Sequence, residues 1–202
     1  MKKSVIFIIV IVAVLALIGF TKGPSFYNTG IVLKEDATAQ WGNVESSYQR
    51  RADLIPNIVK TAKGYAEFEQ ETLTKVIEAR SKATSITIDP TNITPDKLAQ
   101  FQKVQEGMTG ALSKLLAVVE RYPDLKANEN FKELINELER TENRINVERN
   151  RFNESARPFN KHFKTFPNNM FNTFIGKFEE IPYFKAKEGS EDAPEVDFDF
   201  GK

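Results

Sequence analysis

The chain opens with an unbroken apolar segment before any alternation of polar and apolar positions begins. Residues 5–20 carry no charged or strongly polar side chain, and Ser4 and Thr21 extend the uncharged run. This is about the minimum length that crosses the hydrocarbon core of a bilayer, roughly 17–25 residues in a helix. The pattern predicts that the N-terminal segment spans a membrane and tethers everything beyond Lys22 to it.

A helical period follows the apolar segment. Apolar side chains recur every three or four residues at Trp41, Val44, Tyr48, Ala52, Ile55, Val59, Ala62 and Ala66. This stripe predicts an amphipathic helix, in which Pro56 is expected to remove one backbone hydrogen bond and kink the helix. A second helix is expected over about 67–84. A third is expected from Pro95, with Thr94 as its N-cap, to about Arg121.

The expected fourth helix has the clearest periodicity. Large apolar residues recur at seven-residue intervals at Phe131, Leu138, Ile145, Phe152, Phe159 and Phe166. A heptad pattern of this length is typical of coiled-coil or bundle packing with a left-handed crossing. Pro158 is expected to kink or end the regular part of this helix.

The composition changes twice after the heptad region. Residues 168–184 are rich in phenylalanine, and Phe171, Phe174 and Phe178 have the spacing of one helical face. We interpret this segment as a cover packed on the end of the bundle. The alternative is a contact surface for the membrane interface or a neighbouring subunit. Residues 185–202 are acidic and are expected to be disordered.

The residues that flank the apolar segment indicate whether it is cleaved off and how it is oriented in the membrane. A cleavable signal peptide would want small residues before the cleavage site, but Phe20 and Lys22 occupy those positions. An uncleaved anchor is therefore favoured over a cleaved signal. Lys2 and Lys3 favour a cytoplasmic N-terminus with the bulk of the chain outside.

Composition excludes several functional classes. Lysine plus arginine and aspartate plus glutamate balance at 28 each, so no global field favours nucleic acid. The absence of cysteine excludes disulfides, thiolate catalysis and zinc ribbons, and the single histidine, His162, excludes multi-histidine metal sites. The sequence has no phosphate-binding glycine loop and no nucleophile elbow. We therefore expect no catalytic residues, no cofactor and no metal.

Two polar strings on the expected helices are candidates for a shared site. Their members are Arg50, Arg51 and Asp53 on the first helix and Glu142, Asn143 and Arg144 on the fourth. We interpret them as an interhelical network of ion pairs and hydrogen bonds that fixes helix register. The alternative is a carboxylate–guanidinium functional site. A di-metal site on Glu137, Glu142 and Glu148 is not supported, because such sites need Glu-x-x-His repeats.

Three strings carry a resemblance to a known family. They are RRADLIPN at 50–57, YPDLKAN at 122–128 and LERTENRI at 138–145. In sequence, order and spacing they resemble the LemA family of bacterial membrane-anchored proteins, over roughly residues 27–184. The resemblance implies an N-terminal anchor and long antiparallel helices, and it implies little about chemistry.

These observations combine into one prediction. The chain is expected to be all-α, with a transmembrane anchor over 1–24, an elongated antiparallel four-helix bundle with coiled-coil-like packing over 25–184, and an acidic tail over 185–202. The expected function is a single-pass membrane-anchored scaffold or interaction protein of the bacterial cell envelope. The bundle is expected on the extracytoplasmic side of the cell membrane, which is the inner membrane in a Gram-negative bacterium.

The expected partners are the lipid bilayer, through the N-terminal helix, and other proteins or further copies of the chain, but not nucleic acid. Two alternatives stay open. One is an unconventional enzyme or metal-binding protein that uses carboxylates of the bundle. The other is a cleaved, secreted helical binding module.

Overall fold

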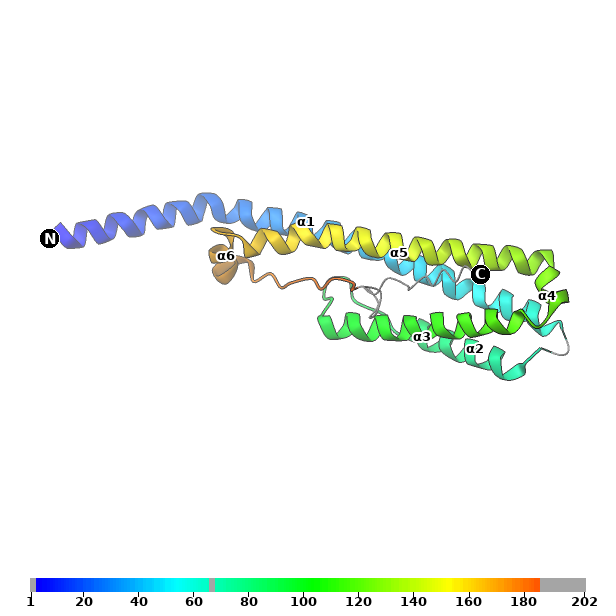
Figure 1. Ribbon diagram of the computed structural model, residues 1–202. Coiled ribbons are helices and arrows are strands. Elements are labelled where there is room, and N and C mark those ends of the chain that lie inside the picture. Colours follow the sequence, from blue (N-terminus) through cyan, green and yellow to red (C-terminus); the bar gives the residue numbers. More distant parts are fainter. Residues whose placement is uncertain (1–2, 66–67, 186–202) are drawn as a thin grey trace, which may run out of the picture.

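The computed structural model describes residues 3–65 and 68–185 (Figure 1). Every regular element within these residues is helical, which confirms the predicted all-α class. The elements are α1 (Lys3–Lys63), α2 (Gln70–Ser85), α3 (Pro95–Val119), α4 (Pro123–Ala127), α5 (Glu129–Lys164), α6 (Asn168–Phe171) and the π-helical turn η1 (Asn172–Gly176). The expectations for Ala66, for Glu67 and for the tail from 186 to 202 lie outside the described residues.

Helix α1 joins the apolar segment and the first helix of the packed region into one element of 61 residues. In the described part of the chain it is also the helix long and apolar enough to cross a membrane, and its apolar window is unburied. Figure 1 shows this N-terminal stretch projecting alone beyond the other helices. The helix passes through both Pro24 and Pro56 without ending. Around Pro56, burial of Ile55, Ile58 and Val59 offsets the lost backbone bond.

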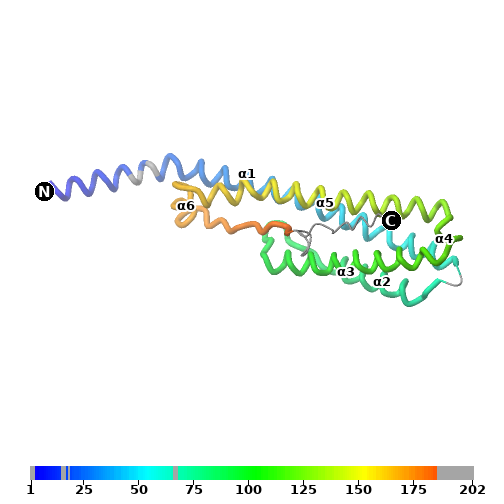
Figure 2. The backbone as a smooth tube through the Cα atoms, viewed as in Figure 1, coloured from blue at the N-terminus to red at the C-terminus, as the bar shows by residue number. Residues whose placement is uncertain are grey.

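The long helices associate in two pairs. Helix α1 packs along α5, α2 packs against α3, and α1 also contacts α2. Helices α3 and α5 make few close contacts with each other, because the cyan part of α1 lies between them in Figure 2. Thr94 begins α3 as expected, because its hydroxyl oxygen accepts a bond from the Lys97 amide at 3.4 Å and Pro95 occupies the first helical position.

Two apolar clusters fill the interior between these helices. The first centres on aromatic side chains, including Trp41, Phe101 and Phe152. The second is mainly aliphatic and includes Ile58, Leu115 and Leu138. On α1 and α5 the boundary between the clusters falls at polar residues, so the core has a polar layer in its middle.

The heptad pattern on α5 is buried over five of its six positions. Phe131, Leu138, Ile145, Phe152 and Phe159 are each at most 3% exposed. Phe166 was wrongly assigned to the pattern, since it is 79% exposed and lies beyond the end of α5 at Lys164. Phe163, four residues after Phe159, is buried in its place.

Pro158 does not end the regular helix, which was one of the two outcomes expected of it. Helix α5 continues for six residues beyond it, to Lys164. Proline removes one backbone hydrogen bond, but Ala156, Phe159 and Asn160 around it are buried against the first cluster. The packing of this face is sufficient to hold the helix.

The phenylalanine-rich segment does not form one helical face. Phe171 and Phe178 turn inward, and each ring centroid lies 5.8 Å from that of Phe26. Phe174 turns outward and is 80% exposed. The reason is a change of backbone, because α6 gives way to the wider η1 and the chain leaves the helix at Lys177, where φ is 46°. Two of the three residues therefore belong to the core rather than to a contact surface.

Candidate functional site

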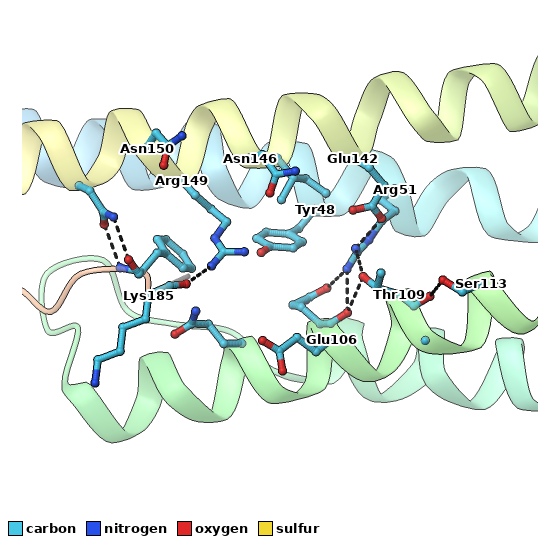
Figure 3. Close-up of a pocket in the computed structure, with 16 residues that line it drawn as sticks. Tyr48, Arg51, Glu106, Thr109, Ser113, Glu142, Asn146, Arg149, Asn150 and Lys185 are labelled. Carbon is cyan, nitrogen blue, oxygen red and sulfur yellow. Dashed lines mark hydrogen bonds and ion pairs between the residues drawn. The ribbon is translucent and has the colours of Figure 1, made fainter. Parts of the chain in front are cut away.

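Arg51 occupies the polar layer between the two apolar clusters. It lies on α1 and is only 1% exposed. Its guanidinium group donates to the Glu142 carboxylate on α5 at 2.6 Å, and to Thr109 Oγ1 at 2.8 Å and Gln105 Oε1 at 2.7 Å on α3. Gln105 Nε2 in turn donates to the carbonyl of Ala83 on α2 at 3.3 Å. Arg51 of α1 thus bonds directly to α3 and α5, as Figure 3 shows, and Gln105 extends the network to α2.

The electrostatics of this network are those of a partly buried ion pair. Arginine keeps its charge in a protein interior, so Arg51 needs acceptors around it. Glu142 supplies the compensating charge while its own side chain stays 32% exposed. Arg51 Nε is buried without a hydrogen-bond partner, so the group is nearly but not fully satisfied. A buried ion pair of this kind is weak evidence for added stability, because desolvation of the two charges offsets their attraction.

The other predicted members of the network are elsewhere. Arg50 pairs with Glu137 at 2.6 Å on the surface, and Asp53 accepts a bond from Gln49 at 2.8 Å within α1. Arg144 lies 4.0 Å from Glu148, and Asn143 is exposed on α5. Of the six predicted residues, the structure brings Arg51 and Glu142 together and leaves the remainder apart.

Sequence reasoning missed the α3 half of the network. Gln105 is a polar residue in an otherwise apolar stripe whose buried members are Leu98, Phe101, Met108, Leu112, Leu115 and Val119. Buried polar side chains are normally hydrogen-bonded, so a glutamine at this position was the available signal. Thr109 is one turn further along α3.

A groove of about 590 Å³ lies beside the network, between α3 and α5. Tyr48 and Arg51 of α1 are among the residues that line it, and Figure 3 shows the flanking side chains of α3 and α5 directed toward this space. Many of the lining side chains are carboxamides, namely Gln102, Gln105, Asn146, Asn150 and Asn153. Amide side chains both donate and accept hydrogen bonds, as does a peptide backbone.

The chain itself reaches one end of the groove. Residues 178–185 run along α5, and two asparagines seven residues apart hold their backbone. Asn160 donates to the Ile181 carbonyl at 2.8 Å and accepts from the Ile181 amide at 2.9 Å. Asn153 makes the same pair of bonds with Phe184, at 2.9 and 2.8 Å. Each asparagine therefore pairs with one residue of an extended segment.

Aromatic packing secures the same segment. The Phe184 ring stacks on Trp41 with centroids 5.8 Å apart, and the Arg149 guanidinium lies 4.8 Å from its centroid. Arg149 also donates to the carbonyl of Lys185 at 2.8 Å. Asn146 continues the asparagine row seven residues further along α5, where its exposed side chain lines the groove beyond Lys185.

Tyr48 is a titratable residue of the groove whose pKa burial shifts. Burial raises the pKa of the Tyr48 phenol, and the nearby carboxylates of Glu142 and Glu106 act in the same direction. The positive charges of Arg149 and Arg51 oppose this shift. A raised pKa keeps the Tyr48 phenol neutral at physiological pH.

The carboxylates considered for a metal site have other partners. Glu137 pairs with Arg50, and Glu148 pairs with Arg151 at 3.0 Å. Across 3–65 and 68–185, three histidine or acidic side chains do not gather closely enough to hold a metal ion. His162 lies at the end of α5, where its Nε2 is 2.9 Å from the Phe26 carbonyl oxygen and its ring stacks on Phe26.

The sequence is similar to a known protein family and to several named proteins. The LemA family model matches residues 40–198. Magnetosome protein MamQ 2 of Paramagnetospirillum magneticum is 27% identical over 182 residues, covering 80% of this chain and 65% of that protein. MamQ of Magnetospirillum gryphiswaldense is 26% identical over 209 residues, covering 93% and 75%. Protein LemA of Metamycoplasma hominis is 29% identical over 145 residues, covering 68% and 63%. The match thus spans slightly less than two thirds of the length of MamQ 2.

Proposed function

The chain belongs to the LemA family, and on this premise we propose that it is a single-pass membrane-anchored docking platform of the bacterial cell envelope. The family and the similarity to magnetosome proteins support a membrane-associated role. The proposal adds that the apolar part of α1 stays attached and crosses the cell membrane. The N-terminus is then cytoplasmic, and the packed helices lie outside.

The observation that carries this proposal is the continuity of α1. The uncharged run from 4 to 21 would rise about 27 Å as a helix, close to the thickness of a hydrocarbon core. The same helix then continues to Tyr48 and Arg51 in the groove, on the order of 40 Å beyond Thr21. A continuous helix holds the groove at a set height above the bilayer, which a flexible linker would not do.

The finer architecture forms part of the proposal. We propose that α1, α2, α3 and α5 act as an elongated antiparallel four-helix bundle with coiled-coil-like packing, spanning residues 25–184. Burial of the heptad positions on α5 supports it, and so does the network through Arg51, which connects the four helices. In this arrangement residues 1–24 form the anchor and 185–202 a separate tail.

We infer that the platform acts by contact rather than by catalysis. The bundle carboxylates that an enzyme or metal site would use are engaged by arginines, as Glu142 is by Arg51. The groove offers instead a row of carboxamides. Asn146 in the groove is spaced seven residues from Asn153, which is seven residues from Asn160. Asn153 and Asn160 already bind an extended backbone. The ligand that fits is therefore an extended polypeptide segment of a partner protein, recognised mainly through its backbone.

In-membrane cross-linking tests this proposal. A photoreactive amino acid replaces Asn146 in the groove, and a matched variant carries it at Glu133, an exposed position on another face of α5. We expect a specific protein adduct from position 146 and none from position 133. Mass spectrometry should place the cross-link within one short stretch of the partner, as an extended ligand requires.

Two outcomes would contradict the proposal. One is an equal yield of adducts from both positions, because that would indicate non-specific proximity. The other is cross-linking from position 146 only to residues 186–202 of the same chain, because the groove would then be closed to partners.

A further inference from the structure

We propose that residues 166–178, which contain α6 and η1, make a second contact with the bilayer that α1 crosses. The exposed apolar face of this segment, which we call the interfacial face, consists of Phe166, Met170, Phe174 and Ile175. The inference rests on the proposed membrane anchor and adds a lipid-binding surface to it.

The contact with α1 sets the height of this segment relative to the bilayer. Ile175 packs on α1 at Gly23, where its Cδ1 lies 3.0 Å from the place that a Cβ would occupy. Gly23 is the second residue after Thr21, so the contact lies about 3 Å past the end of the uncharged run. The interfacial region of a bilayer extends about 5–8 Å beyond the hydrocarbon core on each side. The segment is therefore level with the lipid headgroups.

Close packing holds the segment at this level. A side chain at Gly30 would overlap the Phe178 ring, and one at Gly176 would come within 2.8 Å of Phe26. Asn172 closes the turn, because its side-chain oxygen accepts from the Phe178 amide at 2.7 Å and its side-chain nitrogen donates to the Phe178 carbonyl at 3.1 Å. The segment thus cannot shift far along α1 without breaking these contacts. Figure 1 shows it at the end of the packed helices from which α1 projects.

The interfacial face is strongly exposed to solvent. Phe166, Met170 and Phe174 are four residues apart and are 79%, 56% and 80% exposed. Among the described residues beyond the apolar stretch of α1, Phe166 and Phe174 are the most exposed large apolar side chains. Phe171 and Phe178 supply the buried side of the same segment. A cluster of exposed apolar side chains usually marks a contact surface, and aromatic rings favour the membrane interface.

The surrounding charges suit a lipid surface. Lys22 is exposed next to Gly23, Lys177 is exposed directly after η1, and Lys161 is exposed in the last turn of α5. Lysines at this depth extend their ammonium groups toward the headgroups while their methylenes stay in the apolar layer. Glu179 and Glu180 are also exposed nearby, and Glu180 pairs with Lys164 at 2.6 Å. Lysines still outnumber carboxylates around the face, which therefore fits a bilayer with anionic lipids better than a strongly basic partner.

The consequence is orientation. A single spanning helix leaves the packed helices able to rotate about its axis and tilt. A second contact beside it fixes which side of the body turns to the membrane, and hence where the groove between α3 and α5 opens. The interfacial face would then orient the docking site as well as support the anchor.

The test uses the full chain in phosphatidylcholine and phosphatidylglycerol vesicles, with and without bromine on the acyl chains. Phe174→Trp places a fluorescent reporter on the interfacial face. Val147→Trp is the matched control, because it is 46% exposed on α5 at a distance from the membrane. Trp41, the single native tryptophan, is 1% exposed and about 30 Å beyond Thr21, so it should report no lipid. We expect brominated lipid to reduce the added Phe174→Trp emission about twofold and to leave Val147→Trp unchanged.

A second variant separates the face from the anchor. Met170→Trp should also be quenched, and adding Phe166→Ser and Phe174→Ser should remove that quenching while the chain still floats with the vesicles at alkaline pH. If Phe174→Trp and Met170→Trp are not quenched in chains that keep Phe166 and float, the inference is overturned and the anchor stands. A concentration-dependent blue shift without quenching would also overturn it, since a second copy would then cover the face. A chain that fails to float would refute the anchor itself.

Discussion

At the scale of single residues, Arg51 is the side chain on which the arrangement of helices depends most. It is enclosed between two apolar clusters, yet it reaches acceptors on α3 and α5. Removing one partner of a buried ion pair costs more than the pair contributes, because the other charge is left without compensation. Substitution of Arg51 or Glu142 should therefore lower the free energy of unfolding more than substitution of an ordinary surface charge.

Glu142→Gln should lower the free energy of unfolding by about 1–3 kcal/mol, less than for a fully buried pair because Glu142 is 32% exposed. Glu139→Gln on the exposed surface of α5 is the matched control and should change it by less than about 0.5 kcal/mol. Denaturant unfolding of both variants measures the difference. Indistinguishable midpoints would show that Arg51 does not depend on this carboxylate.

Tyr48 should make stability sensitive to alkaline pH. Burial raises the pKa of its phenol above the unfolded value of about 10, so the unfolded chain loses the proton first. This contribution is fully present below pH 10 and is lost as pH rises from there through the folded-state pKa. Tyr48→Phe keeps the ring against Phe101 and should flatten that part of the pH profile. An unchanged alkaline slope in the variant would exclude Tyr48 as its source.

At the scale of elements, α5 is the helix that its sequence specifies best. Ile145 is 3% exposed on the heptad pattern, whereas Lys132 is exposed and pairs with Glu129, one turn away on α5. Ile145→Asp should cost several kcal/mol by burying a lone carboxylate, and Lys132→Asp should cost about 1 kcal/mol or less. Thermal unfolding followed by circular dichroism separates them. Equal melting temperatures would be incompatible with the heptad assignment.

Periodicity predicted the helices but not where packing overrides a local signal. The start of α3 follows from its capping residue Thr94, and the burial of the heptad positions from Phe131 to Phe159 follows from the seven-residue period. The end expected at Pro158 was wrong, because tertiary contacts hold α5 in a helix through the proline. Phe166 was wrong as a heptad position, because α5 ends before it at Lys164. The path of 178–185 could not be read from periodicity, since it depends on asparagines distant in sequence.

Those asparagines lead to a local prediction. Asn160 is 2% exposed and makes both of its bonds to Ile181. Asn160→Leu would leave the Ile181 amide and carbonyl without partners, at about 1–3 kcal/mol each if they stayed buried. We therefore expect residues 178–185 to detach while α1 and α5 persist. Hydrogen exchange should accelerate at Ile181 and Phe184, whose amides donate to Asn160 and Asn153, and not within α1 and α5. Asn143→Leu serves as the control. Protection retained at Ile181 would contradict the role given to Asn160.

At the scale of the whole molecule, the continuity of α1 was not evident from the sequence. Lys22, Gly23 and Pro24 form an apparent break between anchor and bundle, but the helix continues through them because Phe26 is already buried against α5 and the segment after it. The Arg51–Glu142 pair was foreseen as a network, whereas its α3 partners were not, since one sequence does not show which helices meet. The groove arises from the separation of α3 and α5 and has no local signature.

The most direct test of the account is the state of α1 in native membranes. The protein is extracted from membranes washed with alkaline carbonate, and its intact mass and N-terminal sequence are determined. The account predicts a chain that stays in the membrane fraction and retains residues 1–24 as its anchor. A mature chain that begins near Lys22 and appears in the soluble fraction would contradict it.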